Sequence, residues 1–191
     1  MKVLVACECS QVVTMAFREA GHDAFSCDIQ PCHGSHPQWH VQTNVELIWH
    51  NGWDLIIAHP PCTYLCKAQL WRCQKDPNRM LQQDHAVSFV RRIMGCGCPR
   101  IAIENPDGCL PLRYRTWDQR TSFNKFGDPY GKDICLWLKN LPPLIEGPIV
   151  PATKSVSNHV NGRMTQEQKS RIKSRFMPGI AKAMAEQWGS L

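Results

Sequence analysis

The chain has 191 residues, 43% of them hydrophobic and 20% charged, and a formal net charge of +6. This length suits one domain, 1–191, with a core of its own, and no apolar run approaches the roughly 18 residues of a membrane-spanning helix. The opening residues MKVLVACECS lack the long apolar region and the cleavage site of a secretory signal peptide. We therefore expect a cytoplasmic protein of a single domain.

The first part of the chain predicts strands that alternate with a helix. The apolar run at 2–6 is typical of a strand, and Ser10 is placed to cap a helix over 11–20. A second strand is expected at 23–28. The continuous apolar run DLIIA at 54–58 suits a strand that is covered on both faces.

The later part continues this alternation. A helix is expected at 78–94, where apolar residues recur at helical spacing, and buried strands are expected at 100–104 and 134–138. After the residues MPG, a last helix should pack on the sheet through residues spaced four apart: Ile180, Met184 and Trp188. This pattern predicts an α/β fold, with an open, largely parallel sheet and helices on both faces.

The segment 141–175 differs in composition from the rest of the chain. Its first part, LPPLIEGPIVPA at 141–152, is proline-rich and should be extended. Thr165 and Gln168 form a capping-box pattern, which predicts a short helix in a stretch rich in lysine and arginine. A second basic stretch lies at 113–125. Such charge runs are commonly a solvated face, and a surface for phosphate groups is an equal alternative.

Eleven cysteines are a high and odd number for a chain of this size. A secreted disulfide scaffold would be shorter and less helical, so we interpret most of these residues as reduced thiols. One segment is crowded with potential metal ligands: Cys27, Cys32, His33, His36 and His40. Their spacing matches no framework of paired C-x-x-C motifs. We expect no metal, and a structural zinc site stays as an alternative.

Polar or reactive residues follow four of the predicted strands: ACECS at 6–10, Asp28, HPPC at 59–62 and ENP at 104–106. In open α/β sheets, ligands bind at the carboxyl ends of the strands, so one crevice could hold all four. Asp28 lies about 20 residues after the first turn, the spacing at which an acid reaches the ribose of a nucleoside cofactor. A solvated turn residue is the simpler interpretation of Asp28.

Two of these residues are candidates for catalysis. Cys62 follows two prolines, each of which fixes its own φ, so the thiol lies on a stiff loop. It is either a positioned nucleophile or an incidental residue of a tight turn. Glu104 ends an apolar strand, where burial favours its protonated form and a role as a proton donor. The alternative for Glu104 is a cap on the following helix.

The motifs DLIIAHPPC and IAIENP resemble the DNA cytosine-5 methyltransferases, particularly the short members from phages and prophages. In that family a Pro-Cys loop carries the nucleophile, and a Glu-Asn pair on the next strand grips the target base. The matching residues here are Pro61, Cys62, Glu104 and Asn105. The stretches KVLVACECS, GKDICLWLKNLPPL and PGIAKAMAEQWG are also similar to phage-type members, so the resemblance spans most of the chain.

The resemblance implies a Rossmann-like, S-adenosylmethionine-dependent methyltransferase fold that acts on cytosine in DNA. The Cys62 thiolate would add to ring carbon 6 and make carbon 5 nucleophilic, while Glu104 would hold or protonate ring nitrogen 3. The residues that would contact the base are Pro61, Asn105 and Lys132. The cofactor, S-adenosylmethionine (SAM), would lie against residues at and after the first strands: Ala6, Cys7, Asp28, Asn44 and His59.

Two features depart from the family pattern. Its cofactor loop is glycine-rich so that backbone approaches the ligand closely, whereas ACECSQ contains no glycine. About 35 residues separate LPPL from the last helix, too few for an ordinary target-recognition domain. Recognition of a DNA sequence would then be weak or come from a protein partner. Two other functions stay open: modification of a free pyrimidine nucleotide by the same Cys–Glu chemistry, and a degenerate DNA-binding module without catalysis.

Overall fold

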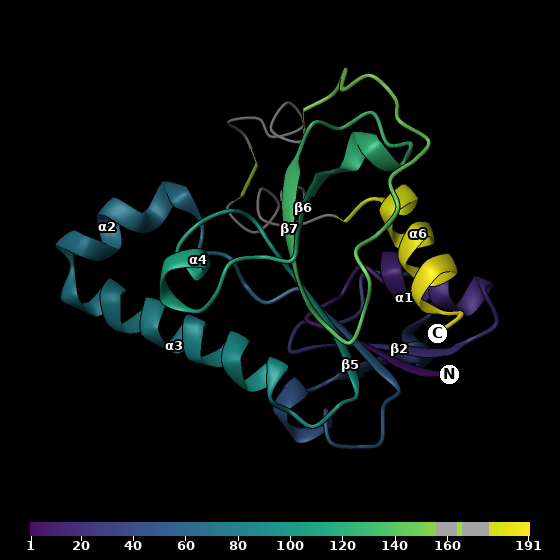
Figure 1. Cartoon of the computed structure of the whole chain (residues 1–191). Coiled ribbons are helices and arrows are strands. Elements are labelled where there is room, and N and C mark those ends of the chain that lie inside the picture. Colours follow the sequence, from purple (N-terminus) through teal and green to yellow (C-terminus); the bar gives the residue numbers. More distant parts are fainter. Residues whose placement is uncertain (156–163, 166–175) are drawn as a thin grey trace.

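The computed structural model describes residues 1–155, 164–165 and 176–191. In these residues a mixed sheet of seven strands runs through the molecule (Figure 1). The strands are β1 (Lys2–Ala6), β2 (Asp23–Asp28), β3 (His40–Gln42), β4 (Leu55–Ala58), β5 (Arg100–Asn105), β6 (Gln119–Ser122) and β7 (Asp133–Lys139). Their order across the sheet is β3-β2-β1-β4-β5-β7-β6. The predicted α/β class with a largely parallel sheet is confirmed.

Helices cover both faces of this sheet, as predicted. The described α-helices are α1 (Val12–Glu19), α2 (Leu70–Lys75), α3 (Pro77–Met94), α4 (Leu110–Arg113) and α6 (Pro178–Trp188). Short 3-10 turns lie at η1 (Pro37–Trp39), η2 (Val45–Leu47), η3 (Lys67–Gln69) and η4 (Phe123–Phe126). Figure 1 shows α1 and α6 on one side of the sheet and α3 on the other, with α2 and α3 forming a hairpin that projects away from the strands.

Two hydrophobic cores, one on each face of the sheet, hold the helices in place. Alternate residues of a strand point to opposite faces. Val3 and Val5 of β1 join the core under α1 and α6, whereas Leu4 and Ala6 join the core under α3. A strand that is buried on both faces needs an apolar residue at nearly every position. This requirement explains why β1, β4 and β5 are continuous apolar runs in the sequence.

The sheet is parallel from β3 to β5 and becomes antiparallel at β7. Ala58 of β4 pairs with Ile103 of β5 in parallel register. In contrast, β7 runs antiparallel to both β5 and β6, and its residue Cys135 pairs with Asn105. The reversed direction brings Lys132, which directly precedes β7, to the edge of the sheet where β4 and β5 end.

The start of α1 differs from the prediction. Gln11, rather than Ser10, occupies the N-terminal cap position, and its side chain makes no capping bond. The buried carboxylate of Glu8 instead accepts hydrogen bonds from the backbone nitrogen atoms of Val13 at 2.8 Å and Thr14 at 3.2 Å. It also accepts one from Thr14 Oγ1 at 2.7 Å. An acid of the preceding loop thus satisfies the free N–H groups of the helix.

The proline-rich segment 141–152 contains no helix or strand. Glu146 fixes it to β6 and η4, because its carboxylate accepts hydrogen bonds from Thr121 Oγ1 at 2.7 Å and Lys125 Nζ at 3.1 Å. The short basic helix predicted after Thr165 lies outside the described residues. None of the described helices is long and apolar enough to cross a membrane.

Candidate active site

The strand order reverses between β1 and β4, from which the sheet extends in opposite directions. Ligands of open α/β sheets bind at the carboxyl ends of the strands beside such a reversal. The strand ends here lie level with one another: Ala6 pairs with Cys27 on one side and Ala58 on the other, and Ala58 pairs with Ile103. The loops after β1, β2, β4 and β5 therefore leave the sheet at one edge.

Three hydrogen bonds hold the Cys62 loop at this edge. The backbone nitrogen of His59 donates to the last carbonyl of β1 at 2.9 Å. The side-chain Nδ2 of Asn105 donates to the carbonyl of Pro60 at 2.8 Å, and the carbonyl of Cys62 accepts from Leu65 at 3.0 Å. A hydrogen bond thus connects the Pro-Cys loop to the Glu-Asn motif at the end of β5. Asn105 Oδ1 is buried and has no hydrogen-bond partner among the described residues, so the predicted base contact of Asn105 stays a prediction.

The thiol of Cys62 is held in its protonated form. Although the residue as a whole is exposed, burial of its sulfur raises the pKa of the thiol above the ordinary value of 9.0. Cys66 and the negative charge of Glu104 raise this pKa further, and the positive charge of Lys132 opposes them. Since the thiolate is the nucleophilic form, Cys62 needs to lose a proton before it can react.

Glu104 is buried and ionised. Burial by itself raises its pKa, but the hydrogen bond from His59 and the charge of Lys132 outweigh burial and bring the pKa below the ordinary value of 4.5. His59 Nδ1 lies 3.3 Å from Glu104 Oε2. The expectation that burial keeps Glu104 protonated is therefore wrong for the unliganded protein, because it neglected these two partners.

Lys132 lies with Cys62 and Glu104 in the candidate site. It lowers the pKa of both Cys62 and Glu104, and its Nζ lies 5.4 Å from the ring centroid of Phe123. Pro61, on the same loop as Cys62, is exposed. The structure thus brings the predicted catalytic and base-contacting residues to one edge, from the loop after β4, the end of β5 and the residue before β7.

Three of the predicted cofactor residues also meet at this edge. Ala6 is buried at the end of β1, and the backbone of Cys7 follows with a φ of 59°. Asp28 ends β2 and lies near Cys7: burial raises the pKa of the Cys7 thiol, and the charge of Asp28 raises it further. Asp28 Oδ1 accepts a hydrogen bond from the backbone nitrogen of Gln30 at 2.8 Å, which shapes the turn after β2.

The other two predicted cofactor residues have local partners. Asn44 Oδ1 accepts a hydrogen bond from the backbone nitrogen of Glu46 at 3.0 Å and so caps η2. The ring of His59 contacts Glu104, which places it beside the Cys62–Glu104 group. Its contact with the cofactor stays a prediction.

The glycine-free loop after β1 has a backbone that glycine commonly adopts. Cys7 and Gln11 both have positive φ, 59° and 62°. Gln11 is buried and bonds the backbone of His36 twice: Nε2 donates to its carbonyl at 2.8 Å, and Oε1 accepts from its nitrogen at 3.1 Å. A Cβ at Gly34 would lie 2.3 Å from Gln11 Oε1.

Sequence reasoning missed both Glu8 and Gln11. These polar residues follow an apolar strand, and their roles depend on their burial, which the sequence does not show.

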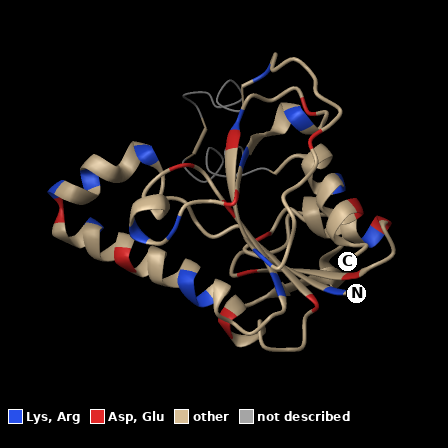
Figure 2. Ribbon diagram, viewed as in Figure 1, with Lys and Arg blue, Asp and Glu red and all other residues tan. Residues whose placement is uncertain are grey.

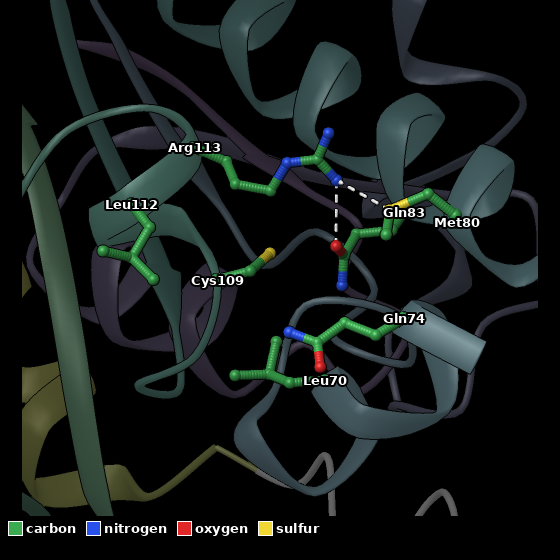
Figure 3. A pocket seen from close by; sticks show the side chains of 7 residues that line it. All are labelled: Leu70, Gln74, Met80, Gln83, Cys109, Leu112 and Arg113. Carbon is green, nitrogen blue, oxygen red and sulfur yellow. Dashed lines mark hydrogen bonds between the residues drawn. The ribbon is translucent and has the colours of Figure 1, made fainter. Parts of the chain in front are cut away.

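Among the surface hollows of the described residues, two lie against α-helices. One, of about 320 Å³, lies between α2, α3 and α4 and is shown in Figure 3 with its lining residues Leu70, Gln74, Met80, Gln83, Cys109, Leu112 and Arg113. Arg113 spans its rim and donates to Gln83 Oε1 at 2.9 Å. The other, of about 830 Å³, runs along α1 and α6. Neither of these two hollows is lined by a predicted site residue.

The candidate zinc ligands have other partners. His40 Nδ1 lies 2.9 Å from Ser26 Oγ, and the ring of His36 stacks on Trp39 with centroids 4.4 Å apart. Cys27 Sγ donates to a backbone carbonyl at 3.4 Å. Over residues 1–155, 164–165 and 176–191, no group of three or more His, Cys, Asp or Glu side chains could hold a metal ion. All eleven cysteines are free thiols.

A positively charged surface lies on α2, soon after the Cys62 loop. Trp71 is 54% exposed, and the charged groups of Arg72 and Lys75 each lie 5.4 Å from its ring centroid. Figure 2 shows positive charge along α2, and Asp76, which follows Lys75, uses its side chain to cap α3. Within the described part of the chain, neither cation forms an ion pair. This α2 surface combines an aromatic face with free positive charge.

A scan against protein-family models and a search of curated proteins found no match for this chain. The functional argument therefore depends on the geometry of the site and on the sequence motifs that form it.

Proposed function

We propose that the protein is a DNA (cytosine-5) methyltransferase that transfers a methyl group from SAM through a covalent adduct on Cys62. The observation that carries the proposal is the junction of the two motifs: Asn105 donates to Pro60 at 2.8 Å, and Glu104 and Lys132 both act on the Cys62 thiol. The strand order β3-β2-β1-β4-β5 agrees with a Rossmann-like sheet. This agreement supports the finer proposal of a methyltransferase fold.

The chemistry explains why these residue types are needed. Cytosine is too electron-poor to attack a methyl donor by itself. In the proposed reaction the Cys62 thiol loses its proton to Glu104, the thiolate bonds to carbon 6, electrons of the ring move toward carbon 5 and nitrogen 3, and nitrogen 3 takes the proton from Glu104. Carbon 5 then takes the methyl group, its own proton passes to water, nitrogen 3 returns its proton to Glu104, and the bond to Cys62 breaks. Lys132 stabilises the thiolate by its charge.

SAM would supply an electrophilic methyl group on a positively charged sulfur. Two observations fit its binding at the ends of β1 and β2. The backbone at Cys7 adopts the left-handed conformation that a glycine commonly takes, and Asp28 lies at the end of β2, where an acid reaches ribose hydroxyls. Ala6 would pack beneath the cofactor. Asn44 and His59 would act through the local hydrogen bonds described above.

A DNA substrate is supported by the α2 surface. A cytosine must leave the duplex before a thiol can reach carbon 6, at a cost of a few kcal/mol. Phosphate contacts by Arg72 and Lys75 and stacking on Trp71 would offset part of this cost. These contacts carry no sequence information, so recognition of a target sequence would fall to a protein partner.

A covalent trap tests residue, substrate and mechanism together. Duplex DNA in which 5-fluorocytosine replaces cytosine throughout holds the adduct, because fluorine replaces the proton that must leave carbon 5. With SAM present, we expect a covalent protein–DNA complex that survives denaturing electrophoresis. Cys62→Ser should form none, while the matched control Cys32→Ser, a thiol in another loop, should form it as the natural protein does. An adduct that persists in Cys62→Ser would disprove the nucleophile.

A DNA-binding module without catalysis is the second candidate. It is favoured by the raised pKa of the Cys62 thiol and by the position of this residue outside both hollows. Calorimetric titration with SAM separates the two functions: binding of SAM supports the enzyme, and DNA binding without SAM binding at millimolar ligand supports the module. Labelled methyl transfer to dCMP but not to DNA would instead identify a nucleotide-modifying enzyme.

A further inference from the structure

The ring of His59 is fixed between the sheet and the last part of the chain. Its Nδ1 lies 3.3 Å from Glu104 Oε2, and the two side chains are only 13% and 11% exposed. Its ring centroid lies 4.7 Å from that of Phe176. The other ring nitrogen, Nε2, is buried and has no hydrogen-bond partner in the described residues. Within those residues, the contact with Glu104 is thus the one polar contact of the ring.

The direction of this hydrogen bond follows from the chemistry of its partner. An ionised carboxylate can only accept, so Nδ1 carries the hydrogen. The other titratable groups that act on Glu104 or on the Cys62 thiol come from three elements: Lys132 before β7, Cys135 on β7 and Cys66 after the Cys62 loop.

The resting state and the reacting state of the site hold the same number of protons in different places. At rest the proton is on the Cys62 sulfur, and Glu104 is ionised. The proposed reaction needs a thiolate at Cys62 and an acid at Glu104. Transfer of one proton from sulfur to carboxylate converts the first pair into the second. The new S–C bond then forms at carbon 6, and the same proton passes to nitrogen 3.

We propose that Cys62 and Glu104 act as a pair that shares one proton, and that His59 is the positioning residue that keeps this proton off the carboxylate until the base binds. The inference rests on the proposed function. It gives His59 a role in the reaction without contact to the base. It also predicts a bell-shaped pH dependence, because the pair is inactive both with two protons and with none.

The pH dependence of adduct formation tests the role of His59. His59→Leu removes the donor at similar size, whereas His59→Asn keeps an N–H donor at the place of Nδ1. Without the donor, less opposes the effect of burial, so the pKa of Glu104 should rise. The acid limb of the rate profile should therefore move to higher pH in His59→Leu. At any pH below that limb, the rate falls about tenfold for each pH unit. His59→Asn should restore the natural profile.

Two results would overturn the proposal. One is an equal loss of rate at every pH in His59→Leu with the acid limb unmoved, which a purely structural role would give. The other is a limb that moves equally in His59→Asn, since that variant keeps the donor.

A second measurement needs neither DNA nor catalysis. The carboxyl carbon of Glu104, labelled with ¹³C and assigned by comparison with Glu104→Gln, reports its titration by NMR. We expect titration at higher pH in His59→Leu than in the natural protein or His59→Asn, and identical titration in all three would refute the role of His59. If the natural protein forms no adduct, the proposed function fails, and this titration still decides whether His59 controls Glu104.

Discussion

The carboxylate of Glu8 provides the sharpest test of how the loop after β1 is built. It is 4% exposed and accepts hydrogen bonds from two backbone N–H groups of α1 and from the hydroxyl of Thr14. Glu8→Ala removes a helix cap worth about 1 kcal/mol, leaves a buried hydroxyl without its acceptor at about 1–3 kcal/mol, and removes a favourable charge at a helix N-terminus worth about 0.3–1 kcal/mol. We expect a loss of about 3 kcal/mol in the free energy of unfolding.

Urea titration followed by tryptophan fluorescence and circular dichroism measures this loss. For a chain of this size, about 3 kcal/mol corresponds to a fall of about 9 °C in Tm, and the slope m should not change. Glu8→Gln keeps an oxygen acceptor and should lose about half as much. Glu19→Ala removes the same charge from an exposed position at the other end of α1 and should change stability by less than about 0.5 kcal/mol. A loss in Glu8→Ala no larger than in Glu19→Ala would refute the capping role.

Three further predictions follow from charges described above. Lys132→Met should raise the pKa of Cys62, so alkylation of this thiol by iodoacetamide should need higher pH; an unchanged pH profile would remove Lys132 from the site. The double variant Arg72→Ala, Lys75→Ala should reduce the slope of log affinity for duplex DNA against log salt by about 2. Its matched control removes two lysines outside α2, Lys2 and Lys182, and equal slopes in the two doubles would exclude the α2 surface from DNA binding. Because its hydroxyl and ammonium partners lower the pKa of Glu146, the stability it contributes is complete above the ordinary pKa of 4.5 and is lost as pH falls through the lower folded value. Thermal melts of Glu146→Gln should therefore depend less on pH in this acid range, and a dependence equal to that of the natural protein would contradict the contact.

The parts of the fold that were predicted correctly are those that one local pattern determines. β1, β4 and β5 are buried on both faces, so each is a continuous apolar run, and α3 repeats its apolar residues at helical spacing. β3 was missed because its three residues, HVQ, lie at the edge of the sheet and carry little apolar surface. The β6 strand, QRTS, was missed for the same reason.

In the candidate site, too, the sequence predicts only what a local pattern determines. The positions of Cys62 and Glu104 follow from strand ends, which the sequence marks with prolines and an asparagine. The state of Glu104 does not, because it depends on His59, a residue 45 positions away in the chain. Burial alone favours a neutral acid, and the contact with His59 together with the charge of Lys132 reverses that preference. Protonation states are a property of neighbours in space, which a single sequence does not display.

The pairing of α1 with α6 has a consequence for biosynthesis. Val13 and Phe17 share a core with Ile180, Met184 and Trp188, side chains that the ribosome adds more than 160 residues later. Until α6 has been synthesised, the face of β1 that carries α1 stays exposed to solvent. The nascent chain therefore presents an apolar surface to chaperones and to other nascent chains. Any truncation that removes the final helix should consequently yield insoluble material rather than a smaller native protein.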